Sequence, residues 1–136
     1  MTTKIGDLLT ITNAIVCEDV RAELNNKWSI LGAYSGDIAV PNVPAAIKIA
    51  FYMEGQLAKP YHGPLSARIR LDNDQVALVT GTMDAKESGP VSLPIPGPIV
   101  PFQNAGTIFM DLSFDSSTWV EVVSKKLIIR SSVPTA

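Results

Sequence analysis

The chain of 136 residues contains a single cysteine and a single histidine, and this scarcity excludes most of the chemistry that a domain of this size can carry. Cys17 has no second cysteine for an intramolecular disulfide, which fits a reducing compartment. Any metal cluster or catalytic triad with a histidine would have to be built around His62 alone. The glycines are dispersed and open no phosphate-binding loop, so nucleotide binding has no support. We predict no catalytic residue, no metal site and no cofactor.

Charge and long apolar runs are also scarce. Charged residues make up 18% of the chain and the formal net charge is −2, so the basic surface that nucleic-acid binding needs is not expected. Asp7, Thr10, Thr12 and Asn13 interrupt the apolar N-terminal stretch, and no stretch reaches the length of a membrane-spanning helix. With 46% hydrophobic residues, we predict one cytoplasmic domain over residues 1–136, with a buried core and no membrane partner.

Alternation of apolar and polar residues at period two is the main structural signal. It is clearest in residues 47–54, where one face carries Ile47, Ile49, Phe51 and Met53. Such a pattern is typical of a half-buried strand. Residues 65–72 repeat the pattern with arginines on the polar face, and residues 108–115 repeat it with carboxylates there. We therefore predict three half-buried strands, of which residues 47–54 have a mixed second face.

Turn residues between apolar runs predict hairpins. The cluster Asp72-Asn73-Asp74 separates two strand-like runs, so residues 65–82 are expected to form an antiparallel hairpin. Asn25-Asn26 separates residues 19–24 from residues 27–34, and asparagine tolerates the positive φ of tight hairpin turns. Residues 119–123 and 127–130 are either one bent strand or a strand pair, and the sequence leaves both open.

Proline and the N-terminus complete the prediction. Residues 88–101 contain five prolines, which rules out an interior strand and favours a rigid crossover between two sheets. Residues 5–12 are the one place where a short helix or a turn is expected. Several short strands without helical periodicity between them favour an all-β fold, an antiparallel β-sandwich that is immunoglobulin-like or similar, with seven to eight strands.

Candidate reactive residues each have a structural explanation. His62 lies in Pro60-Tyr61-His62-Gly63-Pro64 and is expected on a surface loop, and Cys17 is expected to be a buried thiol. Four aspartates could form a calcium site, because loops of all-β domains can gather carboxylates. They are Asp72, Asp74, Asp84 and Asp115. The predicted hairpin turn already explains Asp72 and Asp74 without calcium. The neighbours Glu18 and Asp19 should point to opposite faces of a strand and so form no shared acid–base site.

A resemblance enters with the run Cys17-Glu18-Asp19-Val20-Arg21, followed by residues 27–34, Gly36-Asp37-Ile38 and Val40-Pro41. This run resembles the N-terminal signature of a family of short uncharacterised bacterial proteins, a domain of unknown function. The signature consists of an acidic-Val-Arg strand, a Gly-x-Tyr step and a Gly-Asp-Ile-x-Val-Pro exit. In the C-terminal half the chain departs from the family at Ile108, where a tyrosine-like residue is expected. The resemblance implies a β-sandwich of bacterial or phage origin and implies no activity.

The absence of catalytic patterns favours a non-enzymatic protein-binding or assembly module of unknown biological role. Apolar residues on both faces of residues 76–79 and 120–123 are compatible with a subunit interface, so a homo-oligomer or another protein partner is expected. The alternative is a β-sandwich that binds a small ligand or a carbohydrate. That alternative requires exposed aromatic residues gathered on one concave surface, with these candidates: Tyr34, Tyr52, Tyr61 and Trp119. An enzyme would require His62 in a pocket, beside a carboxylate and a hydroxyl.

Overall fold

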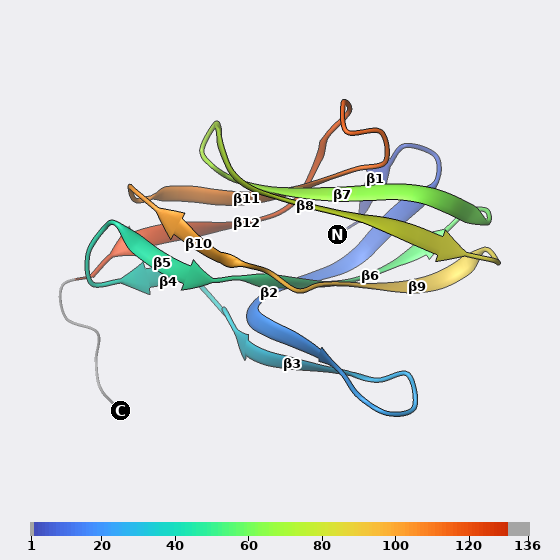
Figure 1. Ribbon diagram of the computed structural model, residues 1–136, viewed down its shortest axis with the longest axis horizontal. Coiled ribbons are helices and arrows are strands. Elements are labelled where there is room, and N and C mark those ends of the chain that lie inside the picture. Colours follow the sequence, from blue (N-terminus) through green and yellow to red (C-terminus); the bar gives the residue numbers. More distant parts are fainter. Residues whose placement is uncertain (1, 131–136) are drawn as a thin grey trace.

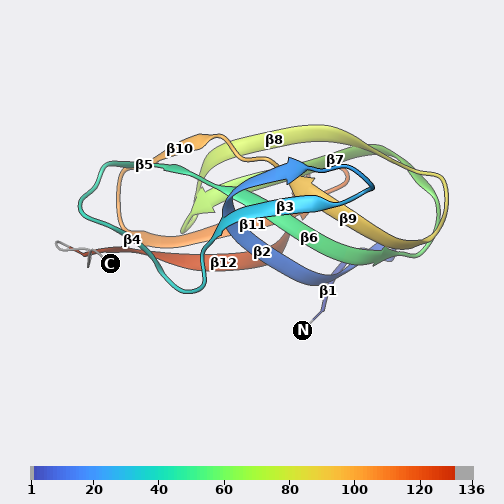
Figure 2. The ribbon, with the colours of Figure 1, turned by 90° about the horizontal axis from the view of Figure 1, so that it is seen from below.

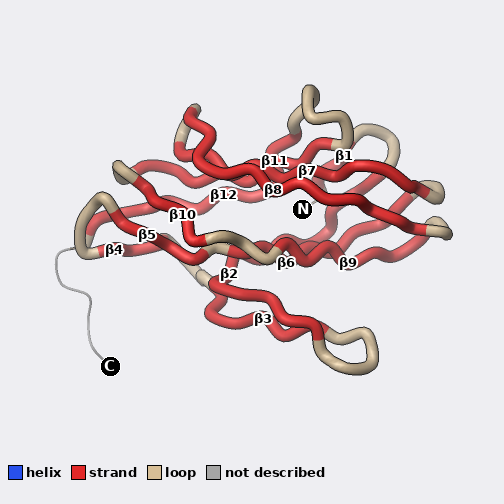
Figure 3. Tube along the Cα trace, viewed as in Figure 1, coloured by secondary structure: helices blue, strands red, loops and turns tan. Residues whose placement is uncertain are grey.

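The computed structural model describes residues 2–130, so the two ends of the predicted domain 1–136 lie outside the described residues. Within them every regular element is a strand, and none is a helix (Figures 1 and 3). The chain is all-β, as predicted, but with twelve strands where seven to eight were expected. The strands are β1 (Thr3–Ile5), β2 (Leu9–Ala22), β3 (Trp28–Ala33), β4 (Ile38–Val40), β5 (Ala45–Lys48), β6 (Ala50–Leu57), β7 (Tyr61–Leu71), β8 (Asp74–Ala85), β9 (Gly89–Ile95), β10 (Ile99–Phe102), β11 (Gly106–Ser113) and β12 (Val120–Ile129).

The strands form two larger sheets and one small one. Sheet A has the order β1-β2-β6-β9, with β3 paired to the second half of β2, and sheet B has the order β4-β12-β11-β7-β8. The third sheet is the pair β5 and β10. All pairs are antiparallel except β4 with β12, which is parallel and corrects the purely antiparallel expectation. No helix in the described part of the chain is long and apolar enough to cross a membrane.

The core lies between sheets A and B and combines the inward faces of both (Figure 1). All four residues of the apolar face predicted in residues 47–54 are buried, with Ile49 and Met53 fully inaccessible. The predicted strand is interrupted at Ile49, so it contributes to β5 and then to β6. The sandwich-like packing therefore follows from the period-two pattern that the sequence displays.

Both predicted hairpins are present. Strands β7 and β8 pair from Tyr61↔Ala85 to Leu71↔Asp74, and β2 pairs with β3 around a tip with Asn25 at φ 62° and Asn26 at φ 57°. The region 119–130, left open by the sequence, is the single strand β12. Of the short helix or turn expected within residues 5–12, the turn is present at residues 6–8 and the helix is wrong, because β1 and β2 form a hairpin around that turn.

The proline-rich segment is a strand where a crossover was predicted. Residues 89–95 form β9, which pairs with β6 and is the edge strand of sheet A. An edge accepts proline because one side of the strand needs no N–H donors. The prediction that this segment is not an interior strand is confirmed, and the prediction of a crossover is wrong for residues 89–95.

The hairpin of β2 and β3 leaves the body of the molecule. The first half of β2 pairs with β6 up to Cys17↔Ala50, and the second half pairs with β3 alone. Figure 1 shows the resulting arm projecting from sheet A, and in Figure 2, seen from below, the arm lies in front of the body. A small cluster anchors its base, where Val20 and Ile30 pack with Cys17, Ala50 and Tyr52. We call residues 18–33 the arm.

Candidate functional site

The outer edge of β8 is an edge of sheet B that pairs with no further strand among the described residues. Strand β8 is the last strand of the sheet, and β10 contacts it without pairing. From Gln75 to Met83 the strand contains neither a proline nor a charged residue. Edge strands are ordinarily protected against pairing by proline, charge, bulges or a covering loop. This edge therefore lacks two of the usual protections over most of its length.

The direction of the backbone groups of β8 follows from Pro64. Pro64 lies opposite Thr82 in the β7–β8 ladder and has no N–H to donate, so this pair belongs to the non-hydrogen-bonded set. The ladder bonds to β7 are then made by the alternate residues, such as Val79 and Gly81. The N–H and C=O groups of Leu78, Thr80 and Thr82 consequently point to the open edge.

The opposing edge strand, β9, is protected. Pro90 and Pro94 lie at alternate positions, and Pro96 follows directly after the strand on the same spacing. Because β9 keeps its pairing with β6 through the residues between them, the prolines face the open side. An additional strand would find few donors there. The two edges are thus unequal, and of the two only β8 is free of proline.

An apolar groove of about 280 Å³ separates these two edges. Most of its wall is apolar, and β8 and β9 supply most of the lining, which consists of Leu65, Ala67, Val79, Thr80, Gly81, Thr82, Met83, Leu93, Pro94, Ile95 and Pro96. Gly81 leaves space in it, because a Cβ placed on Gly81 meets only the Leu65 carbonyl oxygen, at 4.0 Å. The groove is therefore a place for side chains that the chain itself does not fill.

The outer face of β8 carries one exposed apolar side chain, Leu78, and one exposed acidic side chain, Asp84. Leu78 is 51% exposed and lies opposite Arg68 in the ladder. Asp84 has a side chain that is 59% exposed, and its Oδ1 lies 3.5 Å from Nδ1 of His62 on β7. His62 is exposed, as predicted, but it lies in a strand and not on a loop. His62 does not line the groove between β8 and β9.

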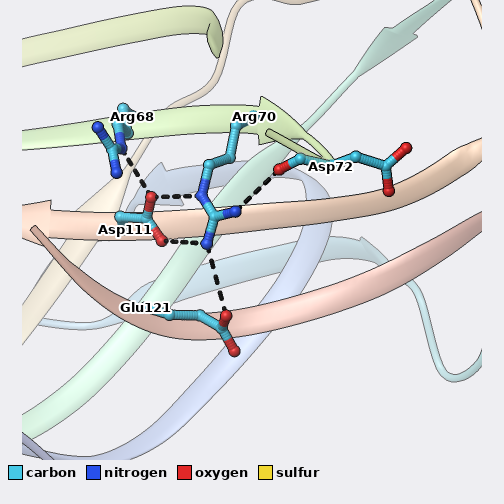
Figure 4. Close-up of polar contacts among 5 residues, drawn as sticks. All are labelled: Arg68, Arg70, Asp72, Asp111 and Glu121. Atoms are coloured by element: carbon cyan, nitrogen blue, oxygen red, sulfur yellow. Dashed lines mark hydrogen bonds and ion pairs between the residues drawn. The ribbon is translucent and has the colours of Figure 1, made fainter. Parts of the chain in front are cut away.

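A buried carboxylate joins three strands on the outer face of sheet B (Figure 4). Asp111 accepts hydrogen bonds from Nε of Arg68 and Nε of Arg70, both at 2.7 Å, and Arg70 also reaches Glu121 at 3.5 Å. The predicted wet face of β11 is wrong at Asp111, which is only 1% exposed. Burial raises the pKa of Asp111, but the hydrogen bonds from Arg70 and Arg68 outweigh it and hold the pKa below its ordinary value.

Aromatic rings cover the two arginines. The guanidinium carbon of Arg68 lies 4.6 Å from the centre of the Trp119 ring, and that of Arg70 lies 4.1 Å from the centre of the Phe109 ring. The loop before β12 positions Trp119, and Asp115 holds that loop by accepting from the N–H groups of Ser117 and Thr118. These bonds lower the pKa of Asp115 well below its ordinary value. The cluster is compact, with both positive charges matched by carboxylates.

The four aromatic residues considered for a carbohydrate site have separate neighbours. Tyr61 packs edge-on against Phe114, with ring centres 4.9 Å apart, while Trp119 stacks on Arg68. The hydroxyl of Tyr34 donates to the Lys48 carbonyl oxygen, and that of Tyr52 to Glu54. Each of the four is thus engaged at a different place in the fold.

The remaining reactive candidates have structural partners. Cys17 is fully buried, as predicted, and burial raises the pKa of its thiol. Asp72 accepts from the Thr107 N–H at 3.0 Å, and Asp19 contacts Arg21 and Lys48. Over the described residues 2–130, no group of three or more histidine, cysteine or acidic side chains could hold a metal ion.

Comparison with known proteins adds no relative. Neither a protein-family model, nor a curated protein, nor a solved structure matches the chain. The resemblance of residues 17–41 to the bacterial family accordingly stays an expectation.

The open edge of β8 is the feature that the sequence analysis did not identify. Its signal was the contrast between residues 75–83, without charge or proline, and the proline-rich residues 90–96. That contrast becomes informative only when both segments are known to be edges.

Proposed function

We propose that the protein is a non-enzymatic protein-binding module that takes an extended segment of a partner protein as an added strand on β8. The edge of β8, which lacks proline and charge from Gln75 to Met83, carries this proposal, since strand addition uses unpaired backbone groups for affinity and neighbouring pockets for specificity. The buried, unpaired Cys17 supports a cytoplasmic setting. No observation favours the carbohydrate-binding alternative, because the aromatic residues it needs have separate neighbours.

The test is the substitution Thr80→Pro, measured against a displayed library of random 12-residue peptides. Thr80 points its N–H to the open edge, so proline there removes an outward donor without breaking a bond to β7. We expect peptides selected on the unaltered protein to lose at least tenfold in affinity for Thr80→Pro. The matched control is Ser92→Pro on the already protected edge of β9, which should bind as the unaltered protein does.

Two results contradict the proposal. One is that the library yields no peptide that binds in the micromolar range. The other is that the selected peptides bind Thr80→Pro and Ser92→Pro equally well. Thermal unfolding of both variants, followed by circular dichroism, checks that each is folded at the temperature of the binding measurement.

A further inference from the structure

The inward side of the β8 edge specifies an apolar side chain in the partner. A strand added to sheet B beside β8 alternates its side chains between the groove and the outer face. The residue opposite Gly81 faces the groove, where Gly81 contributes no side chain and the facing wall is Leu93, Pro94 and Ile95. An apolar side chain there removes this surface from water, and each buried CH₂ group is favourable by about 0.8 kcal/mol. A polar side chain would lose its hydration without gaining a hydrogen bond.

The outer side of the same edge specifies two further positions. Leu78 and Asp84 both lie on the outer face of β8, six residues apart, with Gly81 midway between them. A partner residue opposite Leu78 gains most by being apolar, since it covers a leucine that is 51% exposed. A partner residue opposite Asp84 gains most by being basic, because cross-strand neighbours of opposite charge attract and like charges repel.

We propose that the segment bound at β8 has a basic residue, an apolar residue three positions away that enters the groove, and a second apolar residue three positions further. This inference rests on the proposed function. In a segment antiparallel to β8, the basic residue comes first and the two apolar residues follow it toward the C-terminus. In a segment parallel to β8, the order is reversed. Arginine or lysine satisfies the first position, and leucine, isoleucine, valine, phenylalanine or methionine satisfies the other two.

The β8 edge of a second copy of the chain does not satisfy this pattern. The inward residues of its own β8, Val79, Gly81 and Met83, already line its own groove. It therefore brings no free apolar side chain for the space at Gly81. The occupant that we propose is a segment of a different protein that is extended or becomes extended on binding.

The test uses the peptides selected from the random 12-residue library, bound to two variants of the full chain. Gly81→Val fills the groove, and the open space around the Gly81 Cβ position means that the fold accepts it. We expect Gly81→Val to lower the affinity of the selected peptides at least tenfold with an unchanged or higher melting temperature. A peptide variant with alanine at the groove position should bind the unaltered protein more weakly than the selected peptide does. Its affinity for Gly81→Val should be only slightly lower than its affinity for the unaltered protein.

Charge reversal tests the basic position. A new selection on Asp84→Lys should replace the basic residue of the peptides by an acidic one at the same position, and leave both apolar positions unchanged. Glu87→Lys, a reversal just outside β8, is the matched control and should select the original pattern. The inference is wrong if Gly81→Val binds as the unaltered protein does, or if Asp84→Lys selects the same charges.

The two failures can be told apart. Peptides that lose affinity on Thr80→Pro but not on Gly81→Val or Asp84→Lys overturn the partner pattern and leave strand addition in place. Peptides that are indifferent to Thr80→Pro overturn both. A selection dominated by peptides that match residues 75–83 of the chain itself overturns the heterologous partner in favour of self-association.

Discussion

Asp111 is the residue that links the side chains on the outer face of sheet B, because it binds both Arg68 and Arg70. Its carboxylate contacts two arginines from β7, and Trp119 and Phe109 cover those arginines, so the charges are largely withdrawn from water. Removing one member of such a cluster leaves the others without their counter-charge, which costs more than the pair contributes in total. The arginines keep partial access to water, with side chains 28% and 19% exposed, and this moderates the cost.

We expect Asp111→Ala to lower the free energy of unfolding by about 2–4 kcal/mol. Glu121→Ala removes the half-exposed carboxylate of the same cluster and should cost less than about 1 kcal/mol. Urea unfolding followed by tryptophan fluorescence measures both. Equal effects of the two substitutions would show that burial of Asp111 does not determine its contribution.

The lowered pKa values of Asp111 and Asp115 predict acid sensitivity. An unfolded chain binds protons on these carboxylates at their ordinary pKa, near about 4, while the folded chain resists protonation until a lower pH. Their contribution is therefore complete above about pH 5 and is lost as the pH falls toward the lowered folded-state values. The free energy of unfolding should fall between about pH 5 and pH 2, and fall less steeply in Asp111→Asn. An equal slope in both proteins would contradict the role of Asp111.

The arm has little packing against the rest of the molecule. Its two strands have only a small cluster at the base, and Leu24 at the tip is 84% exposed. An isolated two-stranded hairpin is marginally stable in water. The arm therefore depends on its turn, where both asparagines have positive φ.

We expect Asn26→Val to open the arm locally, because a β-branched residue at positive φ costs about 1–2 kcal/mol. Amide hydrogen exchange in residues 28–33 should accelerate several-fold while that of β6 stays unchanged. Asn26→Gly, which fits the same φ, is the control and should leave exchange unchanged or slower. Acceleration throughout the molecule in Asn26→Val would mean that the arm and the body unfold together.

Individual strands and hairpins of the molecule could be predicted from the sequence. Period-two alternation identified β7, β11 and the buried face around Phe51, because a strand with one buried face must alternate. The hairpins followed from Asn25-Asn26 and Asp72-Asn73-Asp74, whose side chains favour turns whatever surrounds them. These are local properties, and a single sequence contains them.

The site depended on which strands become neighbours, and local patterns do not carry that information. Asp111 was predicted to be exposed, and it is buried beside Arg68 and Arg70 of another strand, with Trp119 stacked on Arg68. The apolar residues of β12 were considered as an interface, but Val122 and Val123 pack into the core of the same chain. The open edge of β8 likewise exists only once the strand order is known.

The most direct test of the open edge is amide hydrogen exchange of the free protein, resolved by residue along β8 with NMR. The N–H groups of Leu78, Thr80 and Thr82 should exchange rapidly, and those of Val79 and Gly81 slowly, because only the second set is bonded to β7. Addition of a selected peptide should slow the first set. Uniformly slow exchange along β8 in the free protein, at all concentrations, would mean that the edge is already covered and that β8 is not the binding surface.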